Sequence, residues 1–525
     1  MNAKIAWRWL GLTVIVTLTA CSPAQSIAEP SAPPTLTATP VEALPDAPTT
    51  TATVSAPRPS PAPTSTLAPT ATPAATVAEA PALLTSTATF TPEVYLPTVM
   101  KDWALAVYET QITLTSYAWE QALRSSDPGS AYYPYHDLER DAVGPPAPRT
   151  YTVVILENSF TRITVLPYLG GRILRWEDRL TGQRLTYENP VIMPVNANWG
   201  YRGWWLATGG VEWAFPVEEH GLNEYLPWEY QLLSGENWRG VRVWHTDWRT
   251  GMTIEITLRL YGGDNTLVIT PRITNPTAGA KPLMFWINAM LTLSGSNAPS
   301  ASLRFWVPTE QMKIHSTGDG RLPGPRSLIS WPAFGGRDFS HYSEWQYYLG
   351  VFATQAQGAM GAYDEGSDLG LVRTYPPAAP QGVKLFCLGD LPSDIFTVDN
   401  SRYFELWGGL NRTFFPEDYL SLGPGQTLTW DERWYAVHGI GGLAWANADL
   451  AAAFKQTAEG VMVGLFAPRA QTVDVVVKQN DLIQGVFPAQ VGPDASFRRA
   501  IPGSGTGWIL ELWKDGLRLA EIAPY

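Results

Sequence analysis

Alternation of apolar and polar residues runs through most of this chain, and it constrains the fold more tightly than any other feature. In the segment MTIEITLRLYGG, residues 252–263, every second residue is apolar. Successive side chains of a strand point to opposite faces, so one face would carry only apolar side chains. The apolar set is Ile254, Ile256, Leu258 and Leu260, and the polar set is Thr253, Glu255, Thr257 and Arg259. This pattern is typical of an antiparallel strand that covers a core with one face.

The same kind of strand recurs along the chain, separated by turns that contain glycine. Residues 160–189 predict a strand, a Gly-Gly turn, a second strand, a Thr-Gly-Gln turn and a third strand. Helical periodicity is scarce, and only residues 446–460 predict a short helix. Many short strands with closely spaced turns predict an all-β protein built from packed sheets. A glycine-rich break at 439–442 further predicts a small β-sandwich domain over residues 443–525.

The first residues have the anatomy of a secretory signal peptide. Lys4 and Arg8 precede an apolar stretch, and LTAC at 18–21 resembles the bacterial lipobox, in which the cysteine is lipidated. The pattern predicts a lipoprotein signal peptide over residues 1–20 and export to the outer face of the cell membrane, with a lipid anchor on Cys21. An ordinary signal peptide with an incidental cysteine is the alternative. No other stretch is long and apolar enough to predict a membrane span.

Residues 21–97 consist mostly of Pro, Thr, Ala and Ser, with very few charged or aromatic residues. Such a segment cannot bury enough apolar surface to offset the entropy that it would lose on ordering. It is therefore predicted to be a disordered linker. It would act as a stalk through the cell envelope, or as a spacer without any recognition role.

Charge and aromatic content narrow the classes of partner. The chain carries 36 Lys and Arg against 48 Asp and Glu, a formal net charge of −12, and it contains no run of basic residues. Nucleic acid and anionic lipid are therefore unsuitable partners, because both require clustered positive charge. The chain has 23 tryptophans, which a large β core can absorb, although tryptophan rings also stack on the apolar faces of sugars. No HExxH, paired CxxC, GxGxxG or P-loop pattern occurs, so we expect no cofactor and no metal site.

One acidic residue stands inside the apolar segment YFELWGG. In a strand, one face would carry Tyr403, Glu405 and Trp407, and the other would carry Phe404 and Leu406. The second face is predicted to be core. The first face would hold a carboxylate framed by two aromatic rings. This face is either a functional surface or only the rim of one.

Several segments, taken in order, resemble the domain of unknown function 5107 family. They are YLGGRILRWEDRLTG, WLATGGVEWAFP, FWINAMLTLSG, and YFELWGG followed by PED and LGPGQTLTWDERWYAV, and the resemblance covers about residues 108–440. That family is similar in fold to galactose mutarotase, or aldose 1-epimerase. The resemblance implies an antiparallel β-supersandwich over residues 98–440, with a wide concave sheet that holds a sugar.

The resemblance also implies a role for Glu405. Mutarotases carry a glutamate base in a late strand, followed by an acidic turn and a Pro-Gly turn. Glu405, the PED at 416–418 and the GPGQT at 423–427 match that order. Mutarotases also use two histidines, whose places are taken here by Thr208 and Ala289. Because an imidazole is what protonates the sugar ring oxygen near neutral pH, the resemblance implies a sugar pocket without ordinary mutarotase chemistry.

Other side chains are candidates for an acid or for sugar binding. Glu212 follows a Gly-Gly pair and is either a structural carboxylate or a partner of Glu405. In such a pair the pKa values of the two acids would be separated, as glycoside hydrolysis requires. His220 is a second candidate acid, although its turn-rich surroundings also fit a surface histidine. The candidate binding residues are Arg172, Trp204, Trp205, Asn288, Tyr403 and Trp407. Of these, Arg172 would bind a hydroxyl or a carboxylate, or else pair with an acid. Asn288 would hydrogen-bond sugar hydroxyls, or else satisfy the backbone of the sheet.

Two functions of different class remain open. The first is a surface-anchored carbohydrate-binding lipoprotein with a mutarotase-like pocket. The second is a glycan-active enzyme, a glycoside hydrolase or a sugar isomerase, that uses Glu405 with Glu212 or His220. A purely structural envelope protein is a third, because fold alone licenses no activity. The expected partners are an oligosaccharide or polysaccharide and, through the anchor alone, a membrane.

Overall fold

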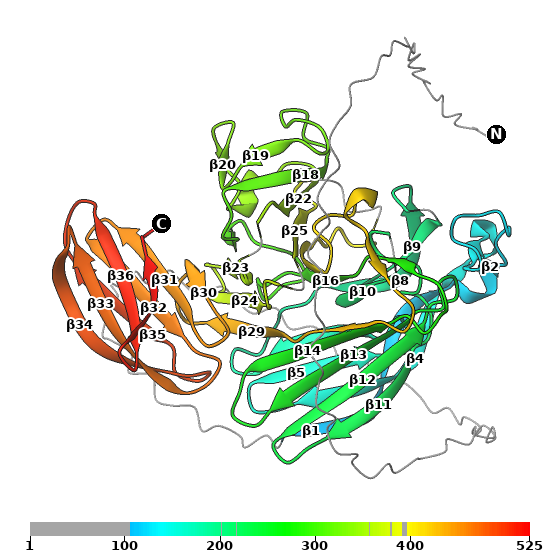
Figure 1. The fold of residues 1–525 in the computed structure, drawn as a ribbon, viewed down its shortest axis with the longest axis horizontal. Coiled ribbons are helices and arrows are strands. Elements are labelled where there is room, and N and C mark those ends of the chain that lie inside the picture. Colours follow the sequence, from blue (N-terminus) through cyan, green and yellow to red (C-terminus); the bar gives the residue numbers. More distant parts are fainter. Residues whose placement is uncertain (1–104, 201, 217, 356, 379–380, 391–395) are drawn as a thin grey trace, which may run out of the picture. The chain divides into compact units, whose positions relative to one another are not determined.

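The computed structural model describes residues 105–525, apart from residues 201, 217, 356, 379–380 and 391–395. Figure 1 shows that this part of the chain is built almost entirely from β-strands. Its helices are single 3-10 turns, η1 (Glu120–Ala122), η2 (Arg140–Ala142), η3 (Tyr342–Glu344) and η5 (Pro416–Asp418). Within the described residues, no helix has the length and apolarity to cross a membrane. The predicted all-β fold is confirmed, whereas the predicted signal peptide, lipidated Cys21 and linker lie outside the described residues.

The larger sheet has 14 strands within the described residues. Its order is β19-β18-β22-β25-β26-β16-β10-β6-β5-β4-β1-β8-β9, with β7 paired to β6. The strands are β1 (Ala106–Ala118), β4 (Gly144–Glu157), β5 (Thr161–Leu166), β6 (Arg172–Asp178), β7 (Gln183–Arg184), β8 (Glu188–Ala197), β9 (Gly203–Gly209), β10 (Val211–Ala214), β16 (Trp286–Leu291), β18 (Gln311–Thr317), β19 (Leu328–Ser330), β22 (Leu349–Ala353), β25 (Gly382–Cys387) and β26 (Phe404–Gly409). Neighbouring strands are antiparallel, apart from β1 and β8, which pair in parallel.

The second sheet has nine strands in the described part of the chain. Its order is β11-β12-β13-β14-β29-β24-β23-β17, with β28 paired to β14. The strands are β11 (Glu229–Ser234), β12 (Trp238–Thr246), β13 (Thr253–Tyr261), β14 (Thr266–Thr274), β17 (Leu303–Trp306), β23 (Ala359–Asp364), β24 (Leu369–Thr374), β28 (Thr427–Thr429) and β29 (Glu432–His438). β13 has the predicted alternation, since its four apolar residues from Ile254 to Leu260 are buried and the polar residues between them are half-buried.

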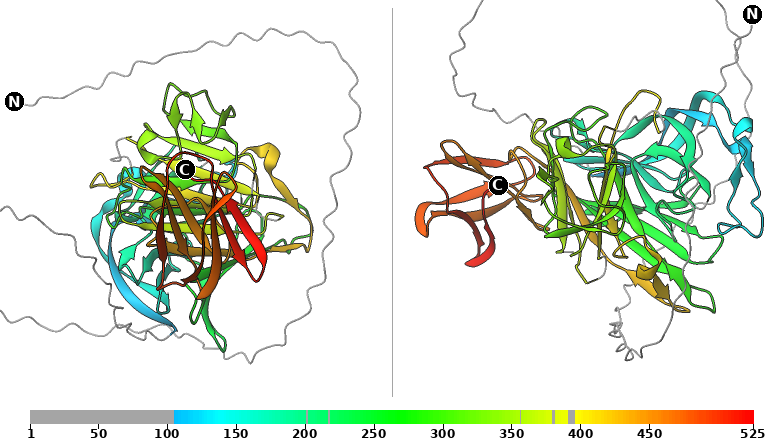
Figure 2. Two further views of the ribbon diagram at one scale, coloured as in Figure 1. Left: turned by 90° about the vertical axis from the view of Figure 1, so that its left-hand side faces the viewer. Right: turned by 90° about the horizontal axis from the view of Figure 1, so that it is seen from above.

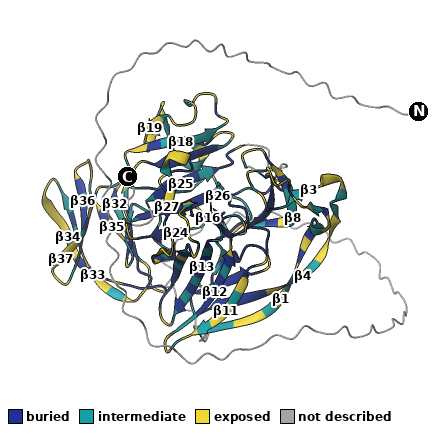
Figure 3. Cartoon of the chain, turned by 45° about the vertical axis from the view of Figure 1, so that its right-hand side comes forward, coloured by how far each residue is buried: buried dark blue, intermediate teal, exposed yellow. Residues whose placement is uncertain are grey.

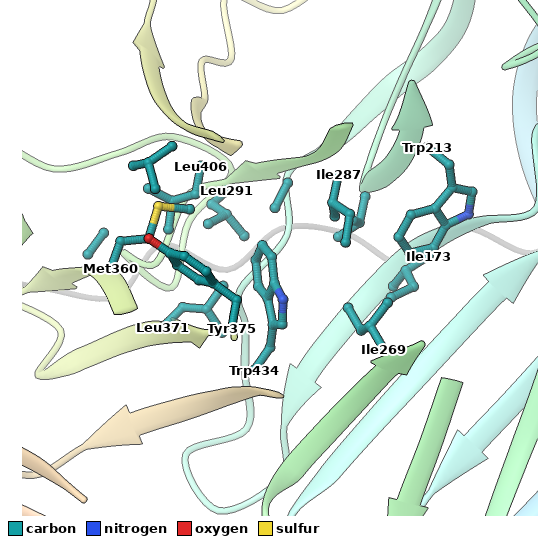
Figure 4. Packing of buried hydrophobic residues seen from close by; sticks show 14 of the residues in the cluster. Ile173, Trp213, Ile269, Ile287, Leu291, Met360, Leu371, Tyr375, Leu406 and Trp434 are labelled. Carbon is teal, nitrogen blue, oxygen red and sulfur yellow. The ribbon is translucent and has the colours of Figure 1, made fainter. Parts of the chain in front are cut away.

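The main core lies between the inner faces of these two sheets. Figure 4 shows Trp213 of β10 and Ile287 of β16 in one cluster with Ile269 of β14 and Trp434 of β29. Apolar side chains from both sheets fill the space between them, so the predicted β-supersandwich is present. Short two-stranded ladders accompany it: β2 (Leu123–Arg124) with β3 (Asp137–Leu138), β15 (Lys281–Leu283) with β27 (Leu420–Leu422), and β20 (Ala333–Phe334) with β21 (Arg337–Asp338).

The central strands of the larger sheet are buried on both faces. Every residue of β10, β16, β22 and β26 is buried, and in β25 only Phe386 is partly exposed. Figure 3 shows β16 and β26 in dark blue, whereas the edge strand β11 carries exposed residues. One face of these strands packs on the nine-stranded sheet, so the other face is covered as well. That second face carries the polar side chains of the candidate site.

The last eight strands form two four-stranded sheets, with the orders β30-β31-β32-β35 and β34-β33-β36-β37. They are β30 (Trp445–Ala446), β31 (Ala451–Thr457), β32 (Gly460–Phe466), β33 (Gln471–Gln479), β34 (Leu482–Val491), β35 (Phe497–Pro502), β36 (Trp508–Lys514) and β37 (Leu517–Ile522). Figure 2 shows these sheets in orange and red, and one apolar cluster that includes Phe454, Val475 and Leu512 joins them. The predicted small β-sandwich is therefore confirmed, and the division of the chain into domains at 440–443 stays a prediction.

The predicted helix at 446–460 is wrong. The structure has strand β31 there, paired along its length with β32. Ala452 and Phe454 face the sandwich core, whereas Ala451 and Ala453 belong to a second apolar cluster on the other face. Because both faces of the strand are buried, its apolar residues do not alternate, and periodicity cannot distinguish such a short apolar run from a helix.

Candidate functional site

Four side chains form a row across the central strands of the larger sheet. Lys384 of β25 lies opposite Trp407 of β26. Trp407 in turn lies opposite Asn288 of β16, which lies opposite Glu212 of β10. Directly opposed residues of neighbouring strands point to the same face, and Glu405, two residues before Trp407, shares that face. The acid that stood out in the sequence therefore lies beside a second acid, an amide and a lysine.

Two donors hold the carboxylate of Glu405. Trp407 Nε1 donates to Oε2 over 2.6 Å, and Asn288 Nδ2 donates to Oε1 over 3.4 Å. The same Asn288 nitrogen donates to Glu212 Oε1 over 3.0 Å, so one amide bridges the two acids. Burial raises the pKa of Glu405 above its ordinary value, although nearby positive charges and the Trp407 hydrogen bond oppose this shift. Glu405 therefore exchanges its proton nearer to neutral pH than a solvated glutamate does.

His220 forms a charged hydrogen bond with Glu212. Its Nδ1 lies 2.5 Å from Glu212 Oε1, and Arg172 Nη2 lies 3.7 Å from Glu212 Oε2. Burial acts to raise the pKa of Glu212, but the attraction of His220 and Arg172 outweighs it, so the pKa is lowered. Burial acts to lower the pKa of His220, but Glu212 outweighs it, so this pKa is raised above 6.5. The pKa values of Glu212 and Glu405 therefore shift in opposite directions, and the cations beside Glu212 are the cause of its lowered pKa.

His220 lies in the loop after β10, which closes where Leu222 N donates to the Phe215 backbone oxygen over 3.3 Å. Gly221 lies against Phe215, and its φ of 72° is in the left-handed region. A Cβ on Gly221 would lie 2.5 Å from the Phe215 backbone nitrogen. Glycine satisfies both conditions without strain, so the residue after His220 allows the close approach of this loop to Phe215.

Glu405 and His220 line one cavity of about 400 Å³. Most of the lining residues are aromatic or aliphatic. The full set is Trp199, Trp205, Glu219, His220, His315, Ser316, Tyr348, Phe386, Leu388, Phe396, Tyr403 and Glu405. Trp199 is 44% exposed, whereas the other lining residues are buried or half-buried, so Trp199 lies at the rim. The cavity thus offers flat apolar walls beside acids and imidazoles, at a size that suits a small ligand.

A second charged cluster lines the cavity at Glu219. Glu219 Oε1 accepts a hydrogen bond from Lys384 Nζ over 2.7 Å and lies 3.6 Å from His315 Nδ1. Burial acts to raise the pKa of Glu219, but His315 and Lys384 outweigh it and lower the pKa to about 2. Burial lowers the pKa of His315 to about 4. At neutral pH this cluster presents an ionised carboxylate and an uncharged imidazole, and no group of three metal-ligating side chains is found among the described residues.

Sequence reasoning missed Glu219, His315 and Lys384. Lys384 is a single charge inside the apolar strand VKLFC, which is the same signal that marked Glu405. His315 alternates with core residues of β18, but polar residues on that face of a strand are commonly solvated. Glu219 lies next to His220 in a loop, where no periodicity indicates which side chain points inward.

Three predicted site residues lie behind the cavity and do not line it. Glu212 is 1% exposed, and Arg172 and Asn288 are fully buried. The guanidinium of Arg172 donates to backbone carbonyls of three residues, Leu169, Gly209 and Glu224. Of the alternatives left open by the sequence, pairing with an acid therefore fits Arg172, which lies 3.7 Å from Glu212. Asn288 likewise bridges the two acids.

Trp204 does not line this cavity, where the prediction placed it, but lines a smaller recess together with Trp199 and His220. Trp204 and Trp205 are consecutive residues of β9, so their side chains point to opposite faces. Trp205 lines the cavity. The ring of Trp204 packs instead on Tyr225, at 4.9 Å between ring centroids, and its Nε1 donates to the backbone oxygen of His136.

Trp407 is also not a wall of the cavity, contrary to the prediction. It is fully buried, with Lys384 Nζ 4.2 Å from the centre of its ring and the His220 ring in T-shaped contact with it at 5.2 Å between centroids. The alternation was predicted correctly, since Phe404 and Leu406 lie in the main core. The error arose because strand geometry gives the face of a residue but not what covers that face.

The two positions that hold histidine in mutarotases carry other residues here, yet the cavity contains imidazoles. Thr208 Oγ1 donates to the Leu206 backbone oxygen, and Ala289 faces the main core. His220 enters the cavity from the loop after β10, and His315 enters it from β18. The imidazoles of the cavity therefore come from other positions than in mutarotases, and one of them is His220, which the sequence marked as a candidate acid.

Comparison with protein families identifies the class to which this chain belongs. The family described as domain of unknown function (DUF5107) matches residues 127–437, which is more than half of the chain. The protein belongs to this family, and the family predicted from the sequence segments is confirmed.

Solved structures resemble this chain in fold. A TPR-domain containing protein from Parabacteroides distasonis is 22% identical with a TM-score of 0.55, over 64% of this chain and 56% of that one. The chain thus spans little more than half the length of that protein. A galactose mutarotase-like protein from Clostridium acetobutylicum is 9% identical with a TM-score of 0.40, over 55% of this chain and 96% of that one. A galactose mutarotase-like protein from Lactobacillus casei is 9% identical with a TM-score of 0.38, over 54% of this chain and 99% of that one.

Proposed function

We propose that the cavity beside Glu405 binds a carbohydrate. Sugar rings present apolar C–H faces to aromatic side chains, and their hydroxyl groups bond to carboxylates and imidazoles. The aromatic residues Trp199, Trp205 and Phe396 supply the first kind of surface, and the acids and imidazoles supply the second. The observation that carries the proposal is that Glu405 and His220 line the same aromatic cavity.

A second candidate function is proton transfer at the anomeric centre of the bound sugar. It is favoured by the Glu212–His220 hydrogen bond, which engages Nδ1 and leaves Nε2 for the substrate. The protonated imidazole would give its proton to the ring oxygen while Glu405 takes the proton of the anomeric hydroxyl. The bond from the anomeric carbon to the ring oxygen then breaks, and that carbon becomes the carbonyl of the open-chain sugar. Reclosure on the opposite face gives the other anomer.

Isomerase-like chemistry fits this arrangement better than hydrolysis by two carboxylates. A glycosidase needs both acids beside the scissile bond. Glu212 is buried behind His220, so it would orient the imidazole and stabilise its positive charge without touching the sugar. In this mechanism Glu405 and His220 are the catalytic residues, and Glu212 is a positioning residue.

Removing the rim tryptophan tests the binding proposal. Trp199→Ala is expected to weaken binding of the best ligand from a glycan array by about 1–3 kcal/mol, or roughly five- to a hundred-fold, because it removes an apolar stacking surface. Isothermal titration calorimetry measures the change. Trp248→Ala is the matched control, since Trp248 is 46% exposed and does not line the cavity. Equal losses in both variants would place the sugar elsewhere.

We also propose that the protein is anchored to the outer face of the cell membrane by lipid on Cys21. The LTAC motif at 18–21, followed by a long Pro- and Thr-rich segment, supports this location. Cys21→Ser is expected to abolish incorporation of radiolabelled palmitate and to release the protein from the membrane fraction. Equal labelling of wild type and Cys21→Ser would contradict the anchor.

A further inference from the structure

We propose that Glu219 is a charge filter that restricts the cavity to uncharged sugars. The inference rests on the proposed function of carbohydrate binding and adds a substrate class to it. Uronic acids resemble the parent sugars in shape, but they carry an anionic carboxylate in place of a hydroxymethyl group. The charges around the cavity decide whether such an anion is accepted.

Glu219 presents an ionised carboxylate to the cavity, and the buried Lys384 shares the charge of one of its two oxygens. Glu219 lines the wall, and its Oε1 is held by Lys384 Nζ over 2.7 Å. The neighbouring His315 lines the same wall, and burial lowers its pKa to about 4, so it adds no positive charge at neutral pH. The carboxylate of Glu219 is therefore an acceptor for sugar hydroxyls and repels another carboxylate.

Two strong cations near the cavity, Lys384 and Arg172, are shielded from it. A third, Arg202, lines a smaller recess beside Trp199 and His220, and its guanidinium is paired with Glu224. The side chain of Lys384 is fully buried, and its ammonium lies over the rings of Trp407 and Phe414, 4.2 Å and 4.6 Å from their centres. The guanidinium of Arg172 is fully buried and donates to three backbone carbonyls. Neither Lys384 nor Arg172 belongs to the lining of the cavity.

Among the described residues that line the cavity, His220 is the cation, and Glu212 shares its charge. Its Nδ1 lies 2.5 Å from Glu212, whose charge therefore offsets that of the imidazolium. An anionic ligand would meet Glu219 and Glu405 without an unshared cation among the described lining residues. Like charges brought together in a desolvated site are strongly unfavourable, so the cavity selects against anions.

The test compares matched neutral and acidic sugars. A glycan array carries glucose and glucuronate, galactose and galacturonate, and mannose and mannuronate oligosaccharides, and calorimetry at pH 7 follows for the strongest neutral ligand and its uronate. The wild type is expected to prefer the neutral ligand by at least about tenfold, because like-charge contacts cost more than the tenfold equivalent in binding free energy. In Glu219→Gln this preference is expected to fall to about threefold or less.

Two further variants keep the result interpretable. Glu229→Gln removes one negative charge from an exposed position on β11, away from the cavity, and is expected to keep the wild-type preference. Glu219→Gln leaves the buried Lys384 without its partner, so the double variant E219Q/K384M, which removes both charges, serves if the single variant does not fold. The filter is overturned if uronates bind the wild type as tightly as neutral sugars, or if a folded variant without Glu219 keeps the full preference. In either of those cases neutral binding persists and the proposed function stands. If neither sugar class binds, the proposed function fails and the filter falls with it.

Discussion

Replacement of Glu405 by glutamine is expected to lower sugar turnover by about 10²–10⁴-fold while it changes binding by less than about tenfold. Glutamine keeps the length and shape of the side chain and can still accept the Trp407 hydrogen bond. It cannot take a proton from the anomeric hydroxyl. Because a general base acts mainly in the transition state, the loss falls on kcat and much less on KM.

Anomer exchange followed by nuclear magnetic resonance measures the turnover, and calorimetry measures the binding. Glu229→Gln, which removes a distant exposed carboxylate, is expected to match the wild type in both. If the wild type binds sugar without any turnover, and Glu405→Gln binds it with unchanged affinity, the enzymatic function is rejected and the carbohydrate-binding function stands.

The pH dependence of kcat/KM gives a second readout of the same site. Activity is expected to rise with pH as Glu405 ionises, and this limb lies above the usual glutamate range because burial raises the pKa of Glu405. Activity is expected to fall again as His220 loses its proton. The raised pKa of His220 keeps the imidazolium present above pH 6.5, so the falling limb lies above that value. A falling limb below pH 6.5 would argue against His220 as the acid.

Alternation predicted the strands well where one face of a strand meets the core and the other meets solvent. β13 has this arrangement, and its predicted faces match the observed burial. The rule failed at β31, whose alanines are buried on both faces and therefore do not alternate. Trp204 shows the same limit at the level of one side chain, since the prediction could not tell which of two consecutive tryptophans faces the cavity.

A local sequence pattern that marked the site also occurs away from it. Strands β26, β29 and β36 each contain Glu-x-Trp, as FELW, DERW and LELW, and in each the indole nitrogen donates to the glutamate two residues before it. The pairs are Trp407 with Glu405, Trp434 with Glu432, and Trp513 with Glu511. The neighbours of these acids come from segments far away in the chain: Asn288 for Glu405, Arg373 for Glu432, and Lys478 for Glu511. One sequence without its pairing partners therefore could not separate the cavity acid from the structural ones.

This comparison leads to a prediction for the acid that lies in the core. Glu432→Leu is expected to lower the free energy of unfolding by about 3–5 kcal/mol, because it leaves the buried charge of Arg373 without a partner. Glu432 Oε2 and Oε1 accept from Arg373 Nε and Nη2 over 2.7 Å and 3.0 Å, and both side chains are fully buried. Trp430 and Trp434 also donate to this carboxylate, so their indole nitrogens would lose a partner as well.

Urea unfolding of wild type, Glu432→Leu, Arg373→Met and the double variant R373M/E432L measures the effect. The double variant is expected to recover most of the stability lost in the single variants, because replacing both buried charges with apolar groups removes the uncompensated charge. Glu405→Gln belongs in the same series, because its carboxylate lines a cavity and its hydrogen-bond donors among the described residues are Trp407 and Asn288, with no arginine. We expect its unfolding midpoint to stay near that of the wild type. If Glu432→Leu were no less stable than Glu405→Gln, the distinction between the core acid and the cavity acid would be refuted. If Glu432→Leu is strongly destabilised and Glu405→Gln is not, the Glu-x-Trp motifs of β29 and β26 differ in role, as their different partners imply.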